Sequence, residues 1–140
     1  MIHFIDLFAG IGGIRLGVSN ALKAHGILSD CVLSSEINPK ACETYQLNYN
    51  EYPQGDIHEI SDIPAFDFLL GGFPCQPFSY AGKRMGFGDT RGTLFFEIER
   101  ILGKYKPKAF LLENVRGLYT HDHGRTFETI MQKLHDLGYG

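Results

Sequence analysis

The sequence predicts an α/β fold with a doubly wound, mostly parallel sheet. Short apolar runs alternate with amphipathic stretches along its 140 residues, a pattern typical of strands that are connected by helices. No repeat or low-complexity segment interrupts this alternation. Apolar residues make up 44% and aromatic residues 13% of the chain, so we expect one buried core and one domain over residues 1–140.

The alternation begins at the N-terminus. Residues 3–8 are an apolar run that we expect to form a buried strand, and residues 14–24 have the periodicity of a helix after a glycine-rich turn. Residues 31–36 are predicted to be the second strand. Asn38 suits the N-cap of a helix over residues 39–48, because its side chain can accept hydrogen bonds from the first turn and the proline that follows has no amide to leave unpaired.

The remaining elements follow the same alternation. We expect a short strand at residues 52–54, a strand at 66–70, a helix at 93–102, a strand at 109–113 and a final helix at 125–137. Helical spacing places these apolar residues on the inner sides of the two helices: Leu94, Phe95, Ile98, Ile101 and Leu102 on the first, and Phe127, Ile130, Met131, Leu134 and Leu137 on the second.

Candidate site residues lie at or just after the end of each predicted strand. They are Phe8 and Gly10 after the first strand, Glu36 after the second, Asp56 after the third, Pro74 and Cys75 after the fourth, and Glu113 and Asn114 after the fifth. The carboxyl ends of parallel strands meet at one edge of a sheet, and ligands of open α/β sheets bind outside that edge. The sequence therefore predicts one site to which separate segments contribute.

The FAGIGG segment after the first strand is either a tight turn alone or part of a nucleotide-binding loop. Glu36 favours the second interpretation, because a carboxylate at the next strand end can accept hydrogen bonds from ribose hydroxyls. A dinucleotide-binding fingerprint needs a third glycine where Arg15 stands, so S-adenosylmethionine is the better-fitting cofactor. Asp56 is either a solvated loop acid or, by its place after the third strand, a contact for the adenine amino group.

Cys75 lies between Pro74 and Pro77. The two prolines fix backbone torsions and would hold the thiol in one direction, which a nucleophile requires and a small buried side chain does not. The other cysteines, Cys31 and Cys42, form no CxxC pair, so neither a disulfide framework nor a structural zinc site is indicated.

The remaining titratable candidates are Glu113 and two histidines. Glu113 ends the apolar run AFLLE, and a carboxylate leaving a buried strand is desolvated, which favours its protonated form. The alternative is a glutamate in an ion pair at the rim of the sheet. His121 and His123 have no third ligand at a useful spacing, so we expect surface residues and predict no metal site.

Charge and hydropathy limit the partners. The formal net charge of −3 argues against a free-standing nucleic-acid binder, although Lys83, Arg84 and Arg91 make the segment after Cys75 locally basic. No apolar run is long enough to span a bilayer, and the N-terminus lacks the features of a signal peptide. We therefore expect no membrane association and a cytoplasmic location, in contact with the nucleoid in a prokaryote.

The motifs of the chain, in order, are FIDLFAGIGGIRLG, SSEINPKACETY, GDI, GGFPCQPFS followed by RGTLFFEIERIL, and ENVRGL. In this order and at these separations they resemble the DNA (cytosine-5)-methyltransferase family over essentially the whole chain. The resemblance implies a Rossmann-like fold of the S-adenosylmethionine-dependent methyltransferases that is incomplete at its C-terminal side.

The resemblance also implies a covalent mechanism on cytosine. Cys75 would attack C6 of a cytosine flipped out of double-stranded DNA, and Glu113 would contact N3 and the exocyclic amine so that C5 can take the methyl group. Asn114 would brace the loop that carries Cys75. Gln76 and Ser79 would contact DNA.

The cofactor residues carry over from the family in the same way. Those implied are Phe8, Gly10 and Gly12 against the cofactor, Glu36 on the ribose, Asp56 and Ile57 beside the adenine, and Pro74 and Leu94 at the methionine end. Ile37 stands where the family often has an aromatic residue. This departure implies a smaller apolar contact with adenine.

The family continues past the last of these motifs with further strands and a target-recognition domain, which are absent here. The resemblance therefore implies that a C-terminal segment or a second polypeptide completes the enzyme, and that these residues alone do not methylate DNA. Two alternatives stay open at this point. One is a non-catalytic, S-adenosylmethionine-binding or regulatory fragment of the same fold, and the other is a nicotinamide-dependent oxidoreductase, which would leave the Pro-Cys segment unexplained.

Overall fold

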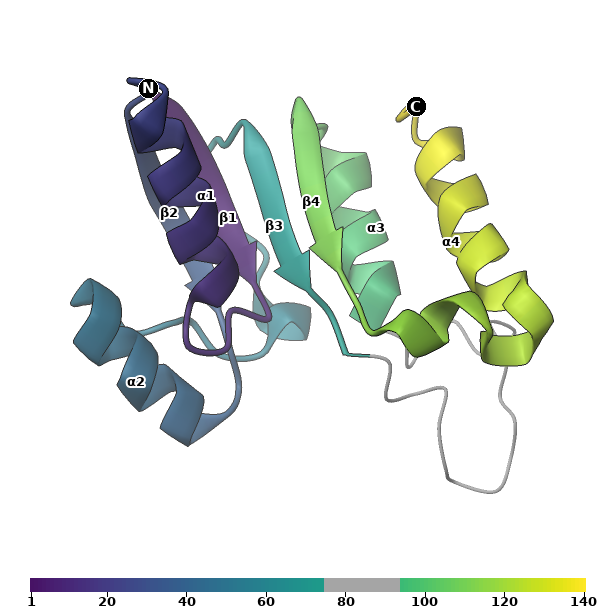
Figure 1. Cartoon of the computed structure of the whole chain (residues 1–140), viewed down its shortest axis with the longest axis horizontal. Coiled ribbons are helices and arrows are strands. Elements are labelled where there is room, and N and C mark those ends of the chain that lie inside the picture. The colour runs from purple at the N-terminus through teal and green to yellow at the C-terminus, as the bar shows by residue number, and fades with distance from the viewer. Residues whose placement is uncertain (75–93) are drawn as a thin grey trace. The chain divides into compact units, whose positions relative to one another are not determined.

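A computed structural model of the chain describes residues 1–74 and 94–140 (Figure 1). The described chain divides into two compact units. The first unit holds Met1–Gly72 and Pro107–Leu112, and the second holds Phe73–Lys106 and Glu113–Gly140.

The first unit is built on a sheet of four strands in the order β2-β1-β3-β4. The strands are β1 (Ile2–Leu7), β2 (Ser29–Ser35), β3 (Phe68–Gly72) and β4 (Ala109–Glu113). Parallel pairing joins β1 to both β2 and β3, and the arrowheads of all the strands lie at the same edge (Figure 1). The predicted α/β class and parallel sheet are confirmed.

The central position of β1 follows from its composition. Phe4, Ile5 and Leu7 are almost completely buried, as expected for a strand that is covered on both faces. Phe4 pairs in register with Cys31 of β2 and with Phe68 of β3. The core thus contains the apolar residues from which the first strand was predicted.

Two helices belong to the first unit, α1 (Gly13–Ala24) and α2 (Pro39–Tyr49). Ile14 and Val18 of α1 pack against the core formed by Phe4, Cys31 and Leu70. The predicted start of α2 is confirmed, because the Asn38 side chain accepts hydrogen bonds from the first-turn amides of Lys40 and Ala41, at 3.0 and 3.2 Å.

The second unit contains α3 (Leu94–Tyr105) and α4 (Arg125–Asp136). Four of the five apolar residues predicted for the inner side of α3 are at most 1% exposed: Phe95, Ile98, Ile101 and Leu102. On α4 the prediction for Met131 is wrong, because its side chain is 50% exposed. The buried stripe runs instead through Thr126, Ile130 and Leu134 at four-residue steps, so the next residue along the chain turns toward solvent.

Proline and glycine explain two further differences. The strand predicted at residues 52–54 is a single parallel bridge between Ser35 and Gln54, since Pro53 has no amide to donate to a ladder. The helix α3 continues through Gly103 to Tyr105, three residues beyond the prediction. It ends where Lys106 adopts a left-handed conformation (φ 48°) before Pro107, which disfavours helical geometry in the residue that precedes it.

We expect Asn38→Ala to lower the free energy of unfolding by about 1 kcal/mol, because the first turn of α2 loses the acceptor for two amides. Urea titration followed by circular dichroism measures the change. Lys40→Ala is the matched control, since Lys40 is exposed on the same turn and its replacement should stay within about 0.5 kcal/mol of the parent. Equal effects of the two substitutions would contradict a capping role.

Candidate functional site

The loop between β1 and α1, residues 8–12, has an unusual backbone. We call it the glycine loop. Phe8, Gly10 and Gly12 all adopt left-handed conformations, with φ of 54°, 55° and 89°. The amide of Ala9 donates to the carbonyl of Ser35, at 2.9 Å, so the start of the loop is attached to the end of β2. A non-glycine residue at positive φ, such as Phe8, is uncommon and is often found at functional sites.

The carboxylate of Glu36 connects this loop to the start of α2. Its Oε2 accepts a hydrogen bond from the Gly10 amide, at 2.7 Å, and its Oε1 accepts from the amides of Ile37 and Asn38, both at 2.9 Å. A carboxylate has about four acceptor positions, so capacity remains at Oε2. The structure thus brings together two predicted cofactor residues that are 26 positions apart.

Asp56 begins a short helical turn, Ile57–Glu59. Its Oδ1 accepts a hydrogen bond from the His58 amide, at 2.9 Å, and lies 2.6 Å from Nδ1 of the His58 ring. The bond from the His58 amide and the bond from the His58 ring lower the pKa of Asp56. Ile57 is buried, whereas Ile37 is 70% exposed and therefore remains available for an apolar contact.

The second unit holds the residues that were predicted to brace the segment before Cys75 and to contact the methionine end of the cofactor. The Asn114 side chain donates through Nδ2 to the carbonyl of Phe73, at 2.8 Å, and accepts through Oδ1 from the amide of Val115, at 2.7 Å. Phe73 also packs against Phe95 of α3, with ring centroids 5.9 Å apart. The hydrogen bond from Asn114 thus reaches the residue that precedes Pro74. Leu94, another predicted cofactor contact, is the first residue of α3.

Glu113 is exposed at the end of β4. The expectation that its strand would desolvate the carboxylate is therefore wrong for this chain. The reason is that exposed and half-buried residues alternate along β4, so Glu113 lies with Ala109 and Leu111 on the face of the strand that is open to solvent. Cys75, the predicted nucleophile, and the predicted DNA contacts Gln76 and Ser79 lie outside the described residues.

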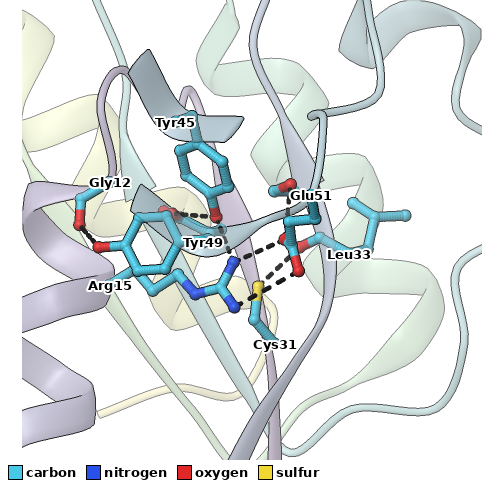
Figure 2. A network of polar contacts seen from close by, with 9 residues as sticks. Gly12, Arg15, Cys31, Leu33, Tyr45, Tyr49 and Glu51 are labelled. Atoms are coloured by element: carbon cyan, nitrogen blue, oxygen red, sulfur yellow. Dashed lines mark hydrogen bonds and ion pairs between the residues drawn. The ribbon is translucent and has the colours of Figure 1, made fainter. Parts of the chain in front are cut away.

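A polar network beneath the glycine loop was missed by the sequence analysis, which treated Arg15 only as a residue that breaks a glycine pattern. The Arg15 guanidinium lies 2.6 Å from Oε1 of Glu51 and 2.8 Å from the Tyr45 hydroxyl (Figure 2). That hydroxyl in turn lies 3.2 Å from Oδ2 of Asp6. The signal that could have revealed the network is Asp6 itself, because a charged residue inside an apolar strand requires a partner.

The environment of Asp6 is almost dry, with 1% of the residue exposed. Burial raises the pKa of Asp6 to about 7, while the hydrogen bond from Tyr45 and the charge of Arg15 act in the opposite direction. The carboxylates of Glu51 and Glu36 add to the increase. Asp6 therefore changes its charge near neutral pH inside the network that contacts the glycine loop.

Among the described residues, no helix is both long enough and apolar enough to cross a membrane. Within residues 1–74 and 94–140, no three side chains from His, Cys, Asp and Glu gather as they would around a metal ion.

Comparison with known proteins identifies the family. The family model for C-5 cytosine-specific DNA methylases matches residues 2–140. The chain belongs to this family. The resemblance predicted from the motifs is therefore confirmed, and the methylase motifs cover the glycine loop, Glu36 and Asn114 described above.

The similar methylases are longer than this chain. It is 70% identical over 139 residues to the type II methyltransferase M.BanI of Aneurinibacillus aneurinilyticus, covering 99% of this chain and 32% of that protein. It is 70% identical over 140 residues to M.HgiCI of Herpetosiphon aurantiacus, covering all of this chain and 33% of that protein. The chain thus spans about one third of the length of these relatives.

Solved structures support the same fold. The chain matches a Spodoptera frugiperda DNMT2 mutant with a TM-score of 0.71 and 26% identity, over 98% of this chain and 41% of that one. It matches the Dnmt2 methyltransferase of S. pombe with a TM-score of 0.65 and 26% identity, over 94% of this chain and 42% of that one. The Rossmann-like methyltransferase fold, present here in part, is confirmed.

The raised pKa of Asp6 predicts a pH-dependent stability. The unfolded chain ionises Asp6 near 3.8, whereas the folded chain keeps the proton until about 7. The contribution of this carboxyl to stability is therefore fully present below about pH 4 and is lost as pH rises through about 7. We expect the stability of the parent relative to Asp6→Asn to fall across this interval, as measured by urea unfolding at a series of pH values.

The matched control is Asp30→Asn, which removes an exposed carboxylate from β2 and should leave the slope of stability against pH close to that of the parent. A parent and an Asp6→Asn variant with parallel pH profiles would show that Asp6 titrates in the folded chain as it does in the unfolded chain.

Proposed function

We propose that this chain is the cofactor-binding and catalytic part of a DNA cytosine-5 methyltransferase, with one domain over residues 1–140. The contact between the Glu36 carboxylate and the Gly10 amide carries the proposal, because it joins two residues that the family motifs assign to the cofactor. Membership of the methylase family supports the reaction class. The proposed substrate is double-stranded DNA, and the proposed location is the cytoplasm.

The first unit offers features that fit S-adenosylmethionine. The remaining acceptor capacity of Glu36 suits a ribose hydroxyl, and the position where Gly10 would carry a Cβ has no atom within 4 Å. Asp56 and Ile57 would border the adenine, with exposed Ile37 packing on it. Phe8 and Gly12 complete the contacts proposed for the first unit. The family motifs assign Pro74 and Leu94, which belong to the second unit, to the methionine end of the cofactor. When bound, S-adenosylmethionine supplies an electrophilic methyl group.

The residues of the chain would prepare the cytosine for that methyl group. The Cys75 thiolate adds to C6 of a flipped cytosine, forming a carbon–sulfur bond and moving an electron pair toward C5. Glu113 holds a proton at N3, which stabilises the resulting enamine. Transfer of the methyl group to C5 would break its bond to the cofactor sulfur and leave that electron pair on the sulfur. Loss of the C5 proton to a base would then return an electron pair to the C5–C6 bond and expel the thiolate.

Asn114 supports this mechanism as a positioning residue. Its bond to the Phe73 carbonyl, at 2.8 Å, ties the end of β4 to the segment that leads into Cys75. Gln76 and Ser79 would contact DNA close to the flipped base. The net charge of −3 gives the chain little attraction for phosphate, so we propose that a C-terminal segment or a second polypeptide supplies most of the DNA-binding surface.

We expect Cys75→Ser to abolish methyl transfer, because a serine hydroxyl is a much weaker nucleophile than a thiolate. Tritiated methyl transfer to mixed-sequence DNA is measured for parent and variant, each alone and each mixed with the C-terminal part of a 70%-identical relative. We expect activity only for the parent in the mixture. A Cys75→Ser mixture with activity near that of the parent would disprove the nucleophile, and turnover by the parent alone would disprove the need for completion.

We expect Glu36→Gln to weaken binding of S-adenosylmethionine by about ten- to a hundredfold, the scale of roughly 1.5 to 3 kcal/mol for hydrogen bonds to a charged group. The amide nitrogen that replaces one oxygen cannot accept from the Gly10 amide or from a ribose hydroxyl. Calorimetric titration measures the dissociation constant. Glu43→Gln, an exposed replacement on α2, is the control, and an unchanged isotherm for Glu36→Gln would count against the ribose contact.

The non-catalytic alternative makes a different prediction in the same experiments. A regulatory fragment would bind S-adenosylmethionine through Glu36 but would show no transfer in any mixture, and it would form no adduct with DNA containing 5-fluorocytosine. The nicotinamide-dependent oxidoreductase is not supported, because the whole chain matches the methylase family.

A further inference from the structure

The last turn of α2 holds two successive carbonyls of the glycine loop. The Tyr49 hydroxyl donates a hydrogen bond to the carbonyl of Gly12, at 2.5 Å, and the Asn48 side chain donates to the carbonyl of Ile11, at 3.0 Å. These donors are 37 positions away from their acceptors in the sequence. The loop is therefore attached to a helix that belongs to the next βα segment.

Tyr49 also fills the space where residue 12 would carry a side chain. An ideal Cβ on Gly12 would lie 2.1 Å from Cε2 of Tyr49, which is far inside van der Waals contact. Gly12 has a φ of 89°, a conformation that favours glycine. The ring and the glycine thus fit each other, and the ring fixes the position of the loop as well as its carbonyl.

Arg15 holds the Tyr49 ring in this position. Its guanidinium carbon lies 4.2 Å from the centroid of the Tyr49 ring, within the range of a cation–π interaction (Figure 2). The side chain of Arg15 is 13% exposed. Its bonds to Glu51 and to the Tyr45 hydroxyl compensate the buried charge and fix the plane of the guanidinium.

The opposite side of the loop is held by Glu36, through its bond to the Gly10 amide at 2.7 Å. We propose that Tyr49, backed by Arg15, is a positioning residue that keeps the loop at residues 10–12 in its cofactor-binding conformation. This inference rests on the proposed function, since it assigns Tyr49 and Arg15 a role in shaping the loop to which the proposed cofactor binds. Without the Tyr49 hydroxyl, a loop with two left-handed glycines populates other conformations, and its apparent affinity for the cofactor falls with the competent fraction.

The test compares S-adenosylmethionine binding by the parent, Tyr49→Phe and Tyr119→Phe. Tyr49→Phe keeps the ring and removes only the hydroxyl. Tyr119→Phe is the matched control, because Tyr119 is 63% exposed and keeps its ring contact with Phe127. We expect calorimetry on fully folded protein to show an affinity about three- to tenfold lower for Tyr49→Phe alone, and parent affinity in that variant would overturn the proposal.

Amide hydrogen exchange without cofactor tests the loop independently of binding. The Gly10 amide donates to Glu36 and the Gly12 amide donates to the carbonyl of Ala9, so both are protected while the loop is held. We expect Tyr49→Phe to speed exchange at these two amides several-fold and to leave the amides of β1 unchanged. A general loss of stability would instead speed exchange throughout the first unit, and such a result would overturn the positioning role.

The two measurements separate the possible failures. A parent that does not bind S-adenosylmethionine contradicts the proposed function, and the exchange data then decide whether Tyr49 holds the loop.

Arg15→Lys is a second variant, because it keeps the positive charge but loses the planar fork that pairs with Glu51 and stacks on Tyr49. This variant should speed exchange at the Gly12 amide. Exchange there at the rate of the parent would contradict the role of Arg15.

Discussion

The ion pair and hydrogen bonds of the partly buried Arg15 guanidinium are the interactions on which the first unit depends. A charge that is removed from water is tolerated only when it is paired and hydrogen-bonded, and Arg15 finds Glu51 after α2 and the Tyr45 hydroxyl within α2. Through Tyr45 the same network reaches Asp6 in the central strand. The helix after the glycine loop, the central strand and the next helix are therefore fixed relative to each other by one cation.

This arrangement explains how a short loop can be precise. The carbonyl side of the loop is attached to α2 through Asn48 and Tyr49, and an amide on its other side is attached to Glu36. Backbone conformations that are costly by themselves, such as that of Phe8 (φ 54°), persist when their surroundings over-determine them. The residues proposed to bind the cofactor and the residues of the polar network thus hold the same loop.

The sequence predicted what depends on local pattern. Strand and helix periods placed every long element, the Asn38 cap was recognisable from two residues, and the motifs identified the family. Two of the errors also have local causes. Pro53 limits the predicted strand at residues 52–54 to a single bridge, and Gly103 does not end α3. What could not be predicted is the pairing of Arg15 with Glu51, 36 positions away, since no periodicity connects residues that meet only through tertiary packing.

The exposure of Glu113 and the exposure of Leu111 have the same physical origin. Both lie on β4, the strand at the edge of the described sheet, and Leu111 is 45% exposed although it is apolar. An apolar edge with unpaired backbone groups favours the addition of another strand. Leu111 and Glu113 are two positions apart, so their side chains lie on the same, exposed face of β4. A segment that covered this face would bury Leu111 and desolvate the Glu113 carboxylate in the same step. In the proposed mechanism Glu113 holds a proton, so covering this face of β4 would also supply the dry environment that this proposed role requires.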